Sequence, residues 1–184
     1  LPQARINVMQ SDGLSVSAAQ AAQRAVHLLL SGPAGGVCAA RDLARRVGLS
    51  QLLTFDMGGT STDVALVGTH NGLTQEAHIG PWPVAVPMAD IHTIGAGGGS
   101  LVRVDNGGLL QVGPASAGAE PGPACYGRGG TQVTVTDAHV VLGRIPANAR
   151  LGGHFSLDRA AAISAMTRLA SELGLGLEAA AAGG

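Results

Sequence analysis

Residues 52–67, LLTFDMGGTSTDVALV, constrain the fold of this chain more than any other stretch. Two short apolar runs, Leu52–Phe55 and Val64–Val67, flank a polar, glycine-rich connection. Runs joined in this way are typical of a β-hairpin, and an adjacent Gly-Gly pair permits positive φ or close approach by a ligand. The sequence therefore predicts a hairpin whose tip lies between two carboxylates, Asp56 and Asp63.

The predicted tip has the chemistry of a phosphate-binding loop. Backbone N–H groups in such a turn form an anion-binding nest, hydroxyl groups add donors, and a carboxylate beside bound phosphate is placed to hold Mg²⁺ through water. An ordinary tight hairpin with a polar tip is the competing interpretation. The candidate phosphate and Mg²⁺ contacts are Asp56, Gly58, Gly59, Thr60 and Ser61, with Asp63 as a weaker candidate.

The residues before the hairpin favour the phosphate-loop interpretation. A turn at Ser31–Gly36, SGPAGG, leads into apolar residues at helical spacing over Val37–Val47. Pro33 lies near the helix start and Gly48 at its end, as expected for these two residue types. The order of turn, helix, strand and hairpin resembles the second half of the actin-like, sugar kinase and Hsp70 ATPase superfamily. In that superfamily ATP lies in a cleft between two domains.

Composition excludes several other classes of function. All 11 basic residues are Arg, so a Walker-type lysine and a lysine Schiff base are excluded and phosphate must be held by backbone, hydroxyls, Arg or metal. The net charge of −1 gives nucleic-acid binding no electrostatic support. No apolar run reaches the ~20 residues of a membrane span and no signal peptide is visible. We therefore expect a cytoplasmic protein with no membrane partner.

The rest of the chain predicts short elements and one long loop. A loop of 18 residues at Gly113–Gly130 is expected to line a site or a subunit contact, because loops of this length are usually functional or disordered. The other predicted elements are a strand at Ile6–Met9, a helix at Ala18–Arg24 capped by Ser15 or Ser17, an edge strand at Glu76–Val86, a hairpin at Leu101–Val112, a short helix near Asp137, and a helix at Leu157–Leu173 with Ser156 as N-cap and Gly174 as stop.

Five ordered motifs, SGPAGG, FDMGGTSTDV, DIHTIGAGGGS, VGPASAGAEPGPACYGRGG and TVTDAHVVLGR, resemble the hydantoinase A/5-oxoprolinase family, which also includes acetone carboxylase-type subunits. The resemblance runs roughly from Val8 to Leu175. It implies an α/β fold, half of a ribonuclease H-like or actin-like ATPase, with a mixed sheet, a β-hairpin phosphate loop and flanking helices. Residues 1–184 are then expected to be a single partial domain, truncated at both ends.

The resemblance implies an ATP-dependent cyclic amide hydrolase of the hydantoinase/5-oxoprolinase type, which phosphorylates the lactam carbonyl before ring opening. ATP and Mg²⁺ are the implied cofactors, and the implied partners are an N-terminal domain of the same protein, a hydantoinase B-type subunit and a small cyclic amide. An acetone or acetophenone carboxylase-type subunit and a non-catalytic actin-like nucleotide-binding domain are the alternatives. The 184 residues alone are expected to be inactive and to bind ATP no tighter than about millimolar.

Two further constellations carry possible chemistry. Cys125, followed downstream by His139, permits a Cys/His hydrolase with a thiolate nucleophile, although PGPACYG is also a loop motif of the resembling family. A second divalent metal, Zn²⁺ or Mn²⁺, is the other hypothesis, and hydrogen-bonding histidines in a polar pocket wall are its simpler alternative. The candidate metal ligands are two pairs at i, i+2 spacing: Asp90 with His92, and Asp137 with His139.

Overall fold

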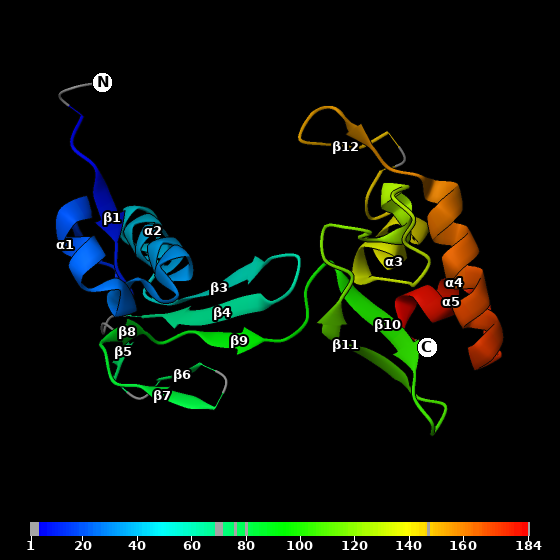
Figure 1. The fold of residues 1–184 in the computed structure, drawn as a ribbon, viewed down its shortest axis with the longest axis horizontal. Coiled ribbons are helices and arrows are strands. Elements are labelled where there is room, and N and C mark those ends of the chain that lie inside the picture. The colour runs from blue at the N-terminus through cyan, green and yellow to red at the C-terminus, as the bar shows by residue number, and fades with distance from the viewer. Residues whose placement is uncertain (1–3, 69–71, 76, 80, 147, 184) are drawn as a thin grey trace. The chain divides into compact units, whose positions relative to one another are not determined.

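The computed structural model describes residues 4–68, 72–75, 77–79, 81–146 and 148–183 (Figure 1). Contacts within the chain divide it into two compact units. Unit 1 comprises Leu1–Asp56 and Asp63–Thr93, and unit 2 comprises Met57–Thr62 and Ile94–Gly184. The tip of the predicted hairpin therefore belongs to unit 2, whereas most of its two strands belong to unit 1. That residues 1–184 form one partial domain stays a prediction.

Unit 1 begins with a small hairpin and three helical segments. Ser17 is the N-cap of the first helix, because its hydroxyl accepts from the Gln20 amide at 3.3 Å and the Gln20 side chain accepts in return from the Ser17 amide. Of the two predicted caps, Ser17 is therefore confirmed. The elements are β1 (Asn7–Met9), β2 (Ser15–Ser17), α1 (Ala18–Gln23), the 3-10 helix η1 (Ala25–Leu28) and α2 (Ser31–Val47).

Helix α2 starts earlier than the sequence predicts. The predicted turn Ser31–Gly36 is itself helical, and the left-handed residue that opens the helix is Leu30, at φ 54°. Pro33 stands in the first turn, where its missing N–H leaves no bond unmade. Gly48, at φ 74°, ends the helix as predicted, because a left-handed C-cap suits glycine.

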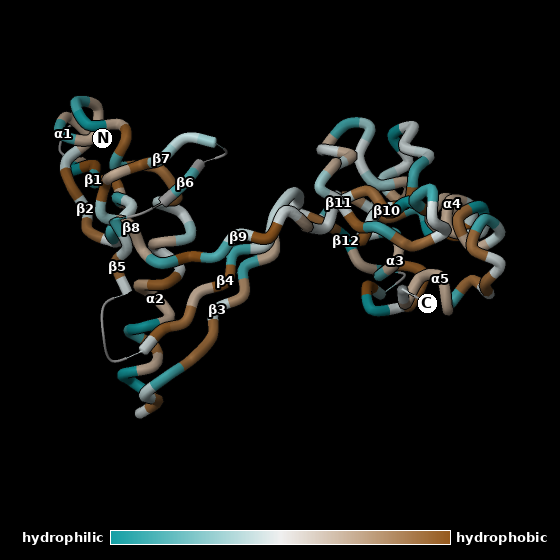
Figure 2. Tube along the Cα trace, turned by 90° about the horizontal axis from the view of Figure 1, so that it is seen from below, coloured by the Kyte–Doolittle hydropathy of each residue, from teal (hydrophilic) through white to brown (hydrophobic). Residues whose placement is uncertain are grey.

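Strands β3 (Leu52–Met57) and β4 (Thr62–Val67) confirm the predicted hairpin, and β9 (His92–Ile94) pairs with β4 to complete a three-stranded sheet. Hydrophobic residues, brown in Figure 2, run along β3 and β4. Val37 of α2 packs with Ala65 and Val67 of β4, so α2 covers one face of the hairpin. Two smaller antiparallel pairs complete unit 1: β5 (Leu73–Thr74) with β8 (Met88–Ala89), and β6 (Ala77–Ile79) with β7 (Trp82–Val84).

The predicted edge strand at Glu76–Val86 is replaced by the β6–β7 pair, and Glu76 itself lies outside the described residues. The predicted α/β class is confirmed, because both units contain helices and strands. Every strand pair whose direction is assigned is antiparallel, and the sheets contain two or three strands. Within the described ranges, no helix is both long and apolar enough to cross a bilayer.

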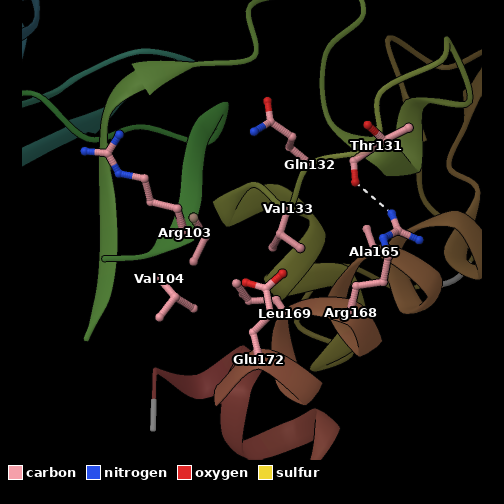
Figure 3. Close-up of a pocket in the computed structure, with 10 residues that line it drawn as sticks. Arg103, Val104, Thr131, Gln132, Val133, Ala165, Arg168, Leu169 and Glu172 are labelled. Atoms are coloured by element: carbon pink, nitrogen blue, oxygen red, sulfur yellow. Dashed lines mark hydrogen bonds between the residues drawn. The ribbon is translucent and has the colours of Figure 1, made fainter. Parts of the chain in front are cut away.

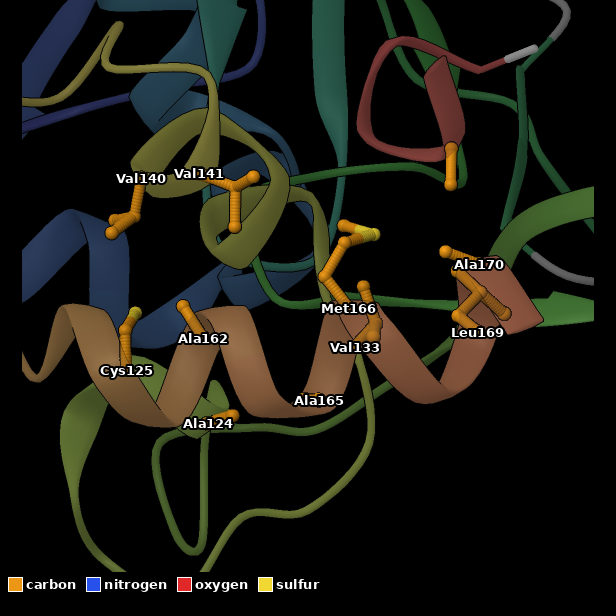
Figure 4. Packing of buried hydrophobic residues seen from close by; sticks show 11 residues of the cluster. Ala124, Cys125, Val133, Val140, Val141, Ala162, Ala165, Met166, Leu169 and Ala170 are labelled. Carbon is orange, nitrogen blue, oxygen red and sulfur yellow. The ribbon is translucent and has the colours of Figure 1, made fainter. Parts of the chain in front are cut away.

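Unit 2 is built on helix α4, which contributes more buried residues to its core than any other element. Small side chains on this helix let neighbouring segments approach closely, and Met166 fills the space between them (Figure 4). The elements are β10 (Ser100–Val104), β11 (Leu110–Ser116), the 3-10 helix η2 (Ala124–Tyr126), α3 (Val135–Val141), β12 (Arg150–Leu151), β13 (Phe155–Ser156), α4 (Arg159–Leu173) and α5 (Leu177–Ala182).

The predicted N-cap of α4 is wrong by two residues. Asp158 caps the helix, with its carboxylate accepting from the Ala161 amide at 2.9 Å. Ser156 instead pairs with Arg150 in the β12–β13 hairpin, and this pairing places it outside the helix start. Gly174, at φ 66°, ends the helix as predicted.

Candidate phosphate-binding site

The tip of the β3–β4 hairpin is held by a glycine-rich loop of the same unit. The Gly58 amide donates across the turn to the Ser61 carbonyl at 2.8 Å. The Gly98 amide donates to the Gly58 carbonyl at 2.9 Å, and the Gly99 amide donates to the Gly59 carbonyl at 2.7 Å. Two successive tip carbonyls are therefore tied to this loop.

Close packing explains why the loop consists of glycines. A Cβ atom added to Gly97 would lie 2.7 Å from both the Gly58 carbonyl oxygen and the Thr60 amide nitrogen. Real Cβ atoms do not approach backbone this closely, so only glycine fits without moving the tip. The Thr62 hydroxyl also donates to the Ala96 carbonyl at 2.6 Å, which adds a side-chain bond to the backbone ones.

The amides of the tip remain available. Within the described part of the chain, the N–H groups of Gly59, Thr60 and Ser61 donate no hydrogen bond. Gly59 and Thr60 are exposed and Ser61 is half-buried. Consecutive free N–H groups next to two hydroxyls form the kind of concave donor set that binds an anion. Of the residues predicted to contact phosphate, Gly59, Thr60 and Ser61 thus present backbone donors, while the carbonyls of Gly58 and Gly59 are bonded to the loop.

A cavity of about 310 Å³ adjoins the tip within unit 2. Its far wall comes from Gly113–Gly130, the segment predicted to be one long loop that lines a site. The prediction of a continuous loop is wrong, because β11 extends to Ser116 and η2 covers Ala124–Tyr126. Ser116, Gly118 and Tyr126 of this segment join the candidate residues. The motif VGPASAGAEPGPACYGRGG marked this loop, but nothing in the sequence indicated which of its residues face the tip. The cavity is lined by Gly59, Thr60, Gly99, Ser116, Gly118, Ala119, Pro123 and Tyr126.

Bonds to Gly99 hold the start of this loop. The Ala117 amide donates to the Gly99 carbonyl at 2.8 Å, and the Ser116 hydroxyl donates to the same oxygen at 3.3 Å. The Gly118 amide donates back to the Ser116 oxygen at 3.2 Å. One glycine therefore contacts the hairpin tip through its N–H and the opposite wall through its C=O.

Asp137 holds the end of the same loop and is fully buried. One carboxylate oxygen accepts from the Cys125 amide at 2.8 Å. The other accepts from the Ala124 amide at 3.1 Å, the Thr134 amide at 2.9 Å and the Thr134 hydroxyl at 2.8 Å. The i, i+2 spacing suggested a metal ligand and gave no sign of these four donors. They make Asp137 part of the capping box of α3 and an anchor for the loop.

The other candidate metal ligands are divided between the two units. Asp90 and His92 are exposed residues of unit 1. His139 belongs to unit 2, and its Nδ1 lies 3.5 Å from a guanidinium nitrogen of Arg144. Among the residues that the structure describes, no three His, Cys, Asp or Glu side chains are grouped as a metal site. The second-metal hypothesis therefore stays a prediction.

The two carboxylates that flank the tip lie in unit 1. Asp56 and Asp63 line a small cavity of about 30 Å³ together with Pro33 of α2. Asp63 accepts from the Thr93 hydroxyl at 2.6 Å, which fixes its orientation. Asp56 is exposed and accepts no hydrogen bond from a described residue. Its carboxylate is free for an external ligand such as a hydrated cation.

Cys125 lacks the properties of a nucleophile. It is fully buried and contacts the core around α4. Burial raises the pKa of its thiol far above the ordinary range, and the nearby Asp137 carboxylate raises it further. A thiol in this setting stays protonated at neutral pH, and catalysis by cysteine requires the thiolate. The geometry therefore gives the Cys/His hydrolase alternative no support.

A second cavity of unit 2, about 270 Å³ in volume, lies between β10 and α4 (Figure 3). Val104, Val133 and Leu169 form an apolar part of its lining. The Arg168 guanidinium, also on the lining, donates to the Thr131 carbonyl at 2.8 Å. None of the predicted site residues lines this cavity, so the tip cavity is the better candidate.

Comparison with known proteins identifies a family for this chain. A family model described as hydantoinase/oxoprolinase matches residues 1–184. The alpha subunit of caprolactamase from Pseudomonas jessenii is 43% identical over 176 residues, which cover 95% of this chain and 25% of that subunit. A 5-oxoprolinase from Pestalotiopsis fici is 44% identical over 145 residues, which cover 77% of this chain and 11% of the enzyme.

A solved structure shows the same fold. The nucleotide-free structure of acetone carboxylase, from work on ATP-dependent acetone carboxylation, matches with a TM-score of 0.84 and 34% identity. The match covers 97% of this chain and 25% of that chain. The chain thus spans a quarter or less of the length of these relatives. Since the family model covers its whole length, the chain belongs to the hydantoinase/oxoprolinase family.

Proposed function

We propose that residues 1–184 are part of an ATP-dependent cyclic amide hydrolase of the hydantoinase/5-oxoprolinase type, and that the hairpin tip binds phosphate groups of ATP. One observation carries this proposal. The carbonyls of Gly58 and Gly59 accept hydrogen bonds from the glycine loop, while the amides of residues 59–61 donate to no described residue and adjoin a cavity of about 310 Å³.

The donors of this cavity suit a polyphosphate. Backbone N–H groups at Gly59, Thr60 and Ser61 provide neutral donors in a fixed turn, and such donors stabilise charge on phosphoryl oxygens without needing to reorganise. The hydroxyl of Thr60 adds an adjustable donor at the tip. A chain without lysine relies on this kind of donor, because it lacks the cation of a Walker-type loop.

Asp56 is the proposed anchor for hydrated Mg²⁺, since it precedes the tip in sequence and accepts no hydrogen bond from a residue that the structure describes. Asp63, oriented by Thr93, is its weaker companion. Bound Mg²⁺ supplies positive charge to the phosphoryl oxygens during transfer. Asp90 and His92 remain candidate ligands for a second divalent ion, Zn²⁺ or Mn²⁺.

The proposed reaction activates an unreactive amide. The γ-phosphoryl group of ATP moves to the carbonyl oxygen of the cyclic amide, and ADP leaves. Water adds to the activated carbon, the ring C–N bond breaks with a proton going to nitrogen, and a second water releases phosphate from the acyl phosphate. The tip N–H groups stabilise the negative charge that spreads over the transferred phosphoryl oxygens.

The complete site needs residues beyond this chain. Because the relatives are four or more times longer and one is named a subunit, we include as partners an N-terminal domain of the same protein and a hydantoinase B-type subunit. We place the assembly in the cytoplasm, with no nucleic acid involved. The acetone carboxylase match, at a TM-score of 0.84, favours ATP-dependent ketone carboxylation as the second candidate function.

Substrate-stimulated release of phosphate tests the proposal. The protein of family length that contains residues 1–184, together with its B-type subunit, is assayed with Mg²⁺ and ATP against 5-oxoproline, hydantoin, caprolactam, or acetone plus bicarbonate. Lactam-dependent phosphate release with a ring-opened product is the expected result. If phosphate release is stimulated by acetone plus bicarbonate but by none of the cyclic amides, the proposed function is wrong and ATP-dependent ketone carboxylation takes its place. ATP binding without turnover by any substrate would point to a non-catalytic nucleotide-binding domain.

A further inference from the structure

The first turn of α3 is bonded to the loop that holds the hairpin tip. The Thr136 amide and hydroxyl both donate to the Gly98 carbonyl, at 2.9 and 2.8 Å. Gly98 in turn donates to Gly58 of the tip. Gly98 therefore links the start of α3 to the hairpin tip: its carbonyl accepts from Thr136, and its N–H donates to Gly58.

The next residue of α3 is bonded in the other direction, to the opposite wall of the cavity. Asp137 accepts from the amides of Ala124 and Cys125. These two residues stand between Pro123 and Tyr126, which line the cavity. Consecutive residues of one helical turn thus contact the two walls of the candidate phosphate site.

We propose that Asp137 is a positioning residue that sets the width of the phosphate cavity by holding the Pro123–Tyr126 wall at a constant distance from the hairpin tip. The expected effect on phosphate affinity rests on the proposed function. The effect on the wall can be measured whether or not the proposed function is correct. Asp137 is not among the residues that line the cavity, so it would act on the site through the wall.

The bonding pattern requires a carboxylate at this position. Asp137 is fully buried and receives four donors on two oxygens. Asparagine has nearly the same shape but offers one acceptor oxygen, and its NH₂ group is a donor. In Asp137→Asn, the side-chain NH₂ group must therefore face donors that the second carboxylate oxygen accepted from before. Either the Cys125 amide or the Ala124 and Thr134 donors lose their acceptor, and a buried donor left unpaired is costly.

The matched control is Asp158→Asn. Asp158 is the N-cap of α4, whereas Asp137 is the third residue of α3 and shares a capping box with the N-cap Thr134. Among the described residues, the Asp158 carboxylate receives only the Ala161 amide of its own helix. The backbone N–H of Asp158 donates to the Cys125 carbonyl at 2.7 Å, and the substitution leaves this backbone bond in place. Both substitutions remove one negative charge at a helix start. Only the first removes bonds to the cavity wall, so a difference between the two variants isolates the wall from ordinary loss of a cap.

Amide hydrogen exchange of the 184-residue chain, read by NMR, tests the position of the wall. In Asp137→Asn the amides of Ala124, Cys125 and Tyr126 should exchange at least tenfold faster than in the wild type, while Asp158→Asn leaves them within twofold. Equal exchange of these amides in both variants would overturn the proposal. If Asp137→Asn does not fold, the exchange rates of the wild type provide the test. The amides of Ala124 and Cys125 should then exchange as slowly as the Thr134 amide. Exchange a hundredfold faster than that of Thr134 would refute the anchoring.

Titration with Mg-ATP, followed by the amide shifts of residues 59–61, tests the consequence for the site. The Kd should rise at least threefold in Asp137→Asn and stay unchanged in Asp158→Asn. A loosened wall with unchanged affinity would refute the positioning role. If the wild type shows no shifts at any ATP concentration, the proposed binding of phosphate by the tip of this chain fails, and the exchange rates alone then decide whether Asp137 holds the wall.

Discussion

Substitution of Gly97 by alanine tests whether close packing of the glycine loop sets the position of the hairpin tip. The added methyl group would lie 2.7 Å from the Gly58 oxygen and the Thr60 nitrogen, and 2.8 Å from the Gly59 carbonyl carbon. All three atoms belong to the backbone, so no side-chain rotation relieves the contact. The tip must move by about 0.7 Å to reach the ordinary contact distance of 3.4 Å.

This movement has a cost that can be worked from the bonds it breaks. Hydrogen bonds of 2.9 Å to Gly58 and 2.7 Å to Gly59 would lengthen to about 3.6 and 3.4 Å, at or beyond the limit of a hydrogen bond. Each lost bond is worth about 1 kcal/mol net, and overpacking adds about 1–3 kcal/mol. We expect Gly97→Ala to lower the free energy of unfolding of unit 2 by about 3–5 kcal/mol.

Gly36→Ala is the control, because it adds the same methyl group to α2, where nothing lies within 4 Å. This variant should be more stable than the wild type by about 0.5–1 kcal/mol, the helix propensity gained on replacing glycine. Urea denaturation followed by circular dichroism measures both free energies. If Gly97→Ala unfolds within about 0.5 kcal/mol of the wild type, the loop does not set the position of the tip and our account of the site is wrong.

Three further predictions follow from the same structure. Asp56→Asn in the protein of family length should lower kcat for ATP by about 10² or more with an unchanged circular dichroism spectrum, because only charge is removed; near-normal turnover would reject the Mg²⁺ role. Asp158→Ala should cost about 1 kcal/mol of stability through the lost bond to Ala161, whereas Ser156→Ala should change it by less than about 0.5 kcal/mol; the reverse order in thermal melts would restore Ser156 as the cap. Because burial raises the pKa of Cys125 above its unfolded value, the thiol contributes stability that is fully present below about pH 8.5 and is lost as pH rises further; denaturation from pH 8 to 10.5 should show a steeper fall for the wild type than for Cys125→Ala, and parallel slopes would contradict the assigned burial.

Much of the fold could be predicted because it depends on local pattern. The hairpin over residues 52–67 follows from two apolar runs around a Gly-Gly turn, and Gly48 and Gly174 end their helices because a left-handed C-cap suits glycine. Helix starts were predicted less well. Ser156 and Asp158 are both good caps, and the β12–β13 pairing decides between them. The start of α2 was missed because its first turns read as a glycine-proline loop.

The site divides in the same way between sequence and tertiary structure. The sequence alone determined that Gly58–Ser61 would form a tip rich in donors, since a nest needs only consecutive amides in a turn. Only the tertiary structure decided that the tip carbonyls are tied to Gly98 and Gly99, that Ser116 and Tyr126 line the facing wall, and that Asp137 anchors this wall. These contacts join residues 12 to more than 50 positions apart in the sequence. Spacing along a chain reports which side chains share a face of one helix or strand, but not which distant amide a buried carboxylate will meet.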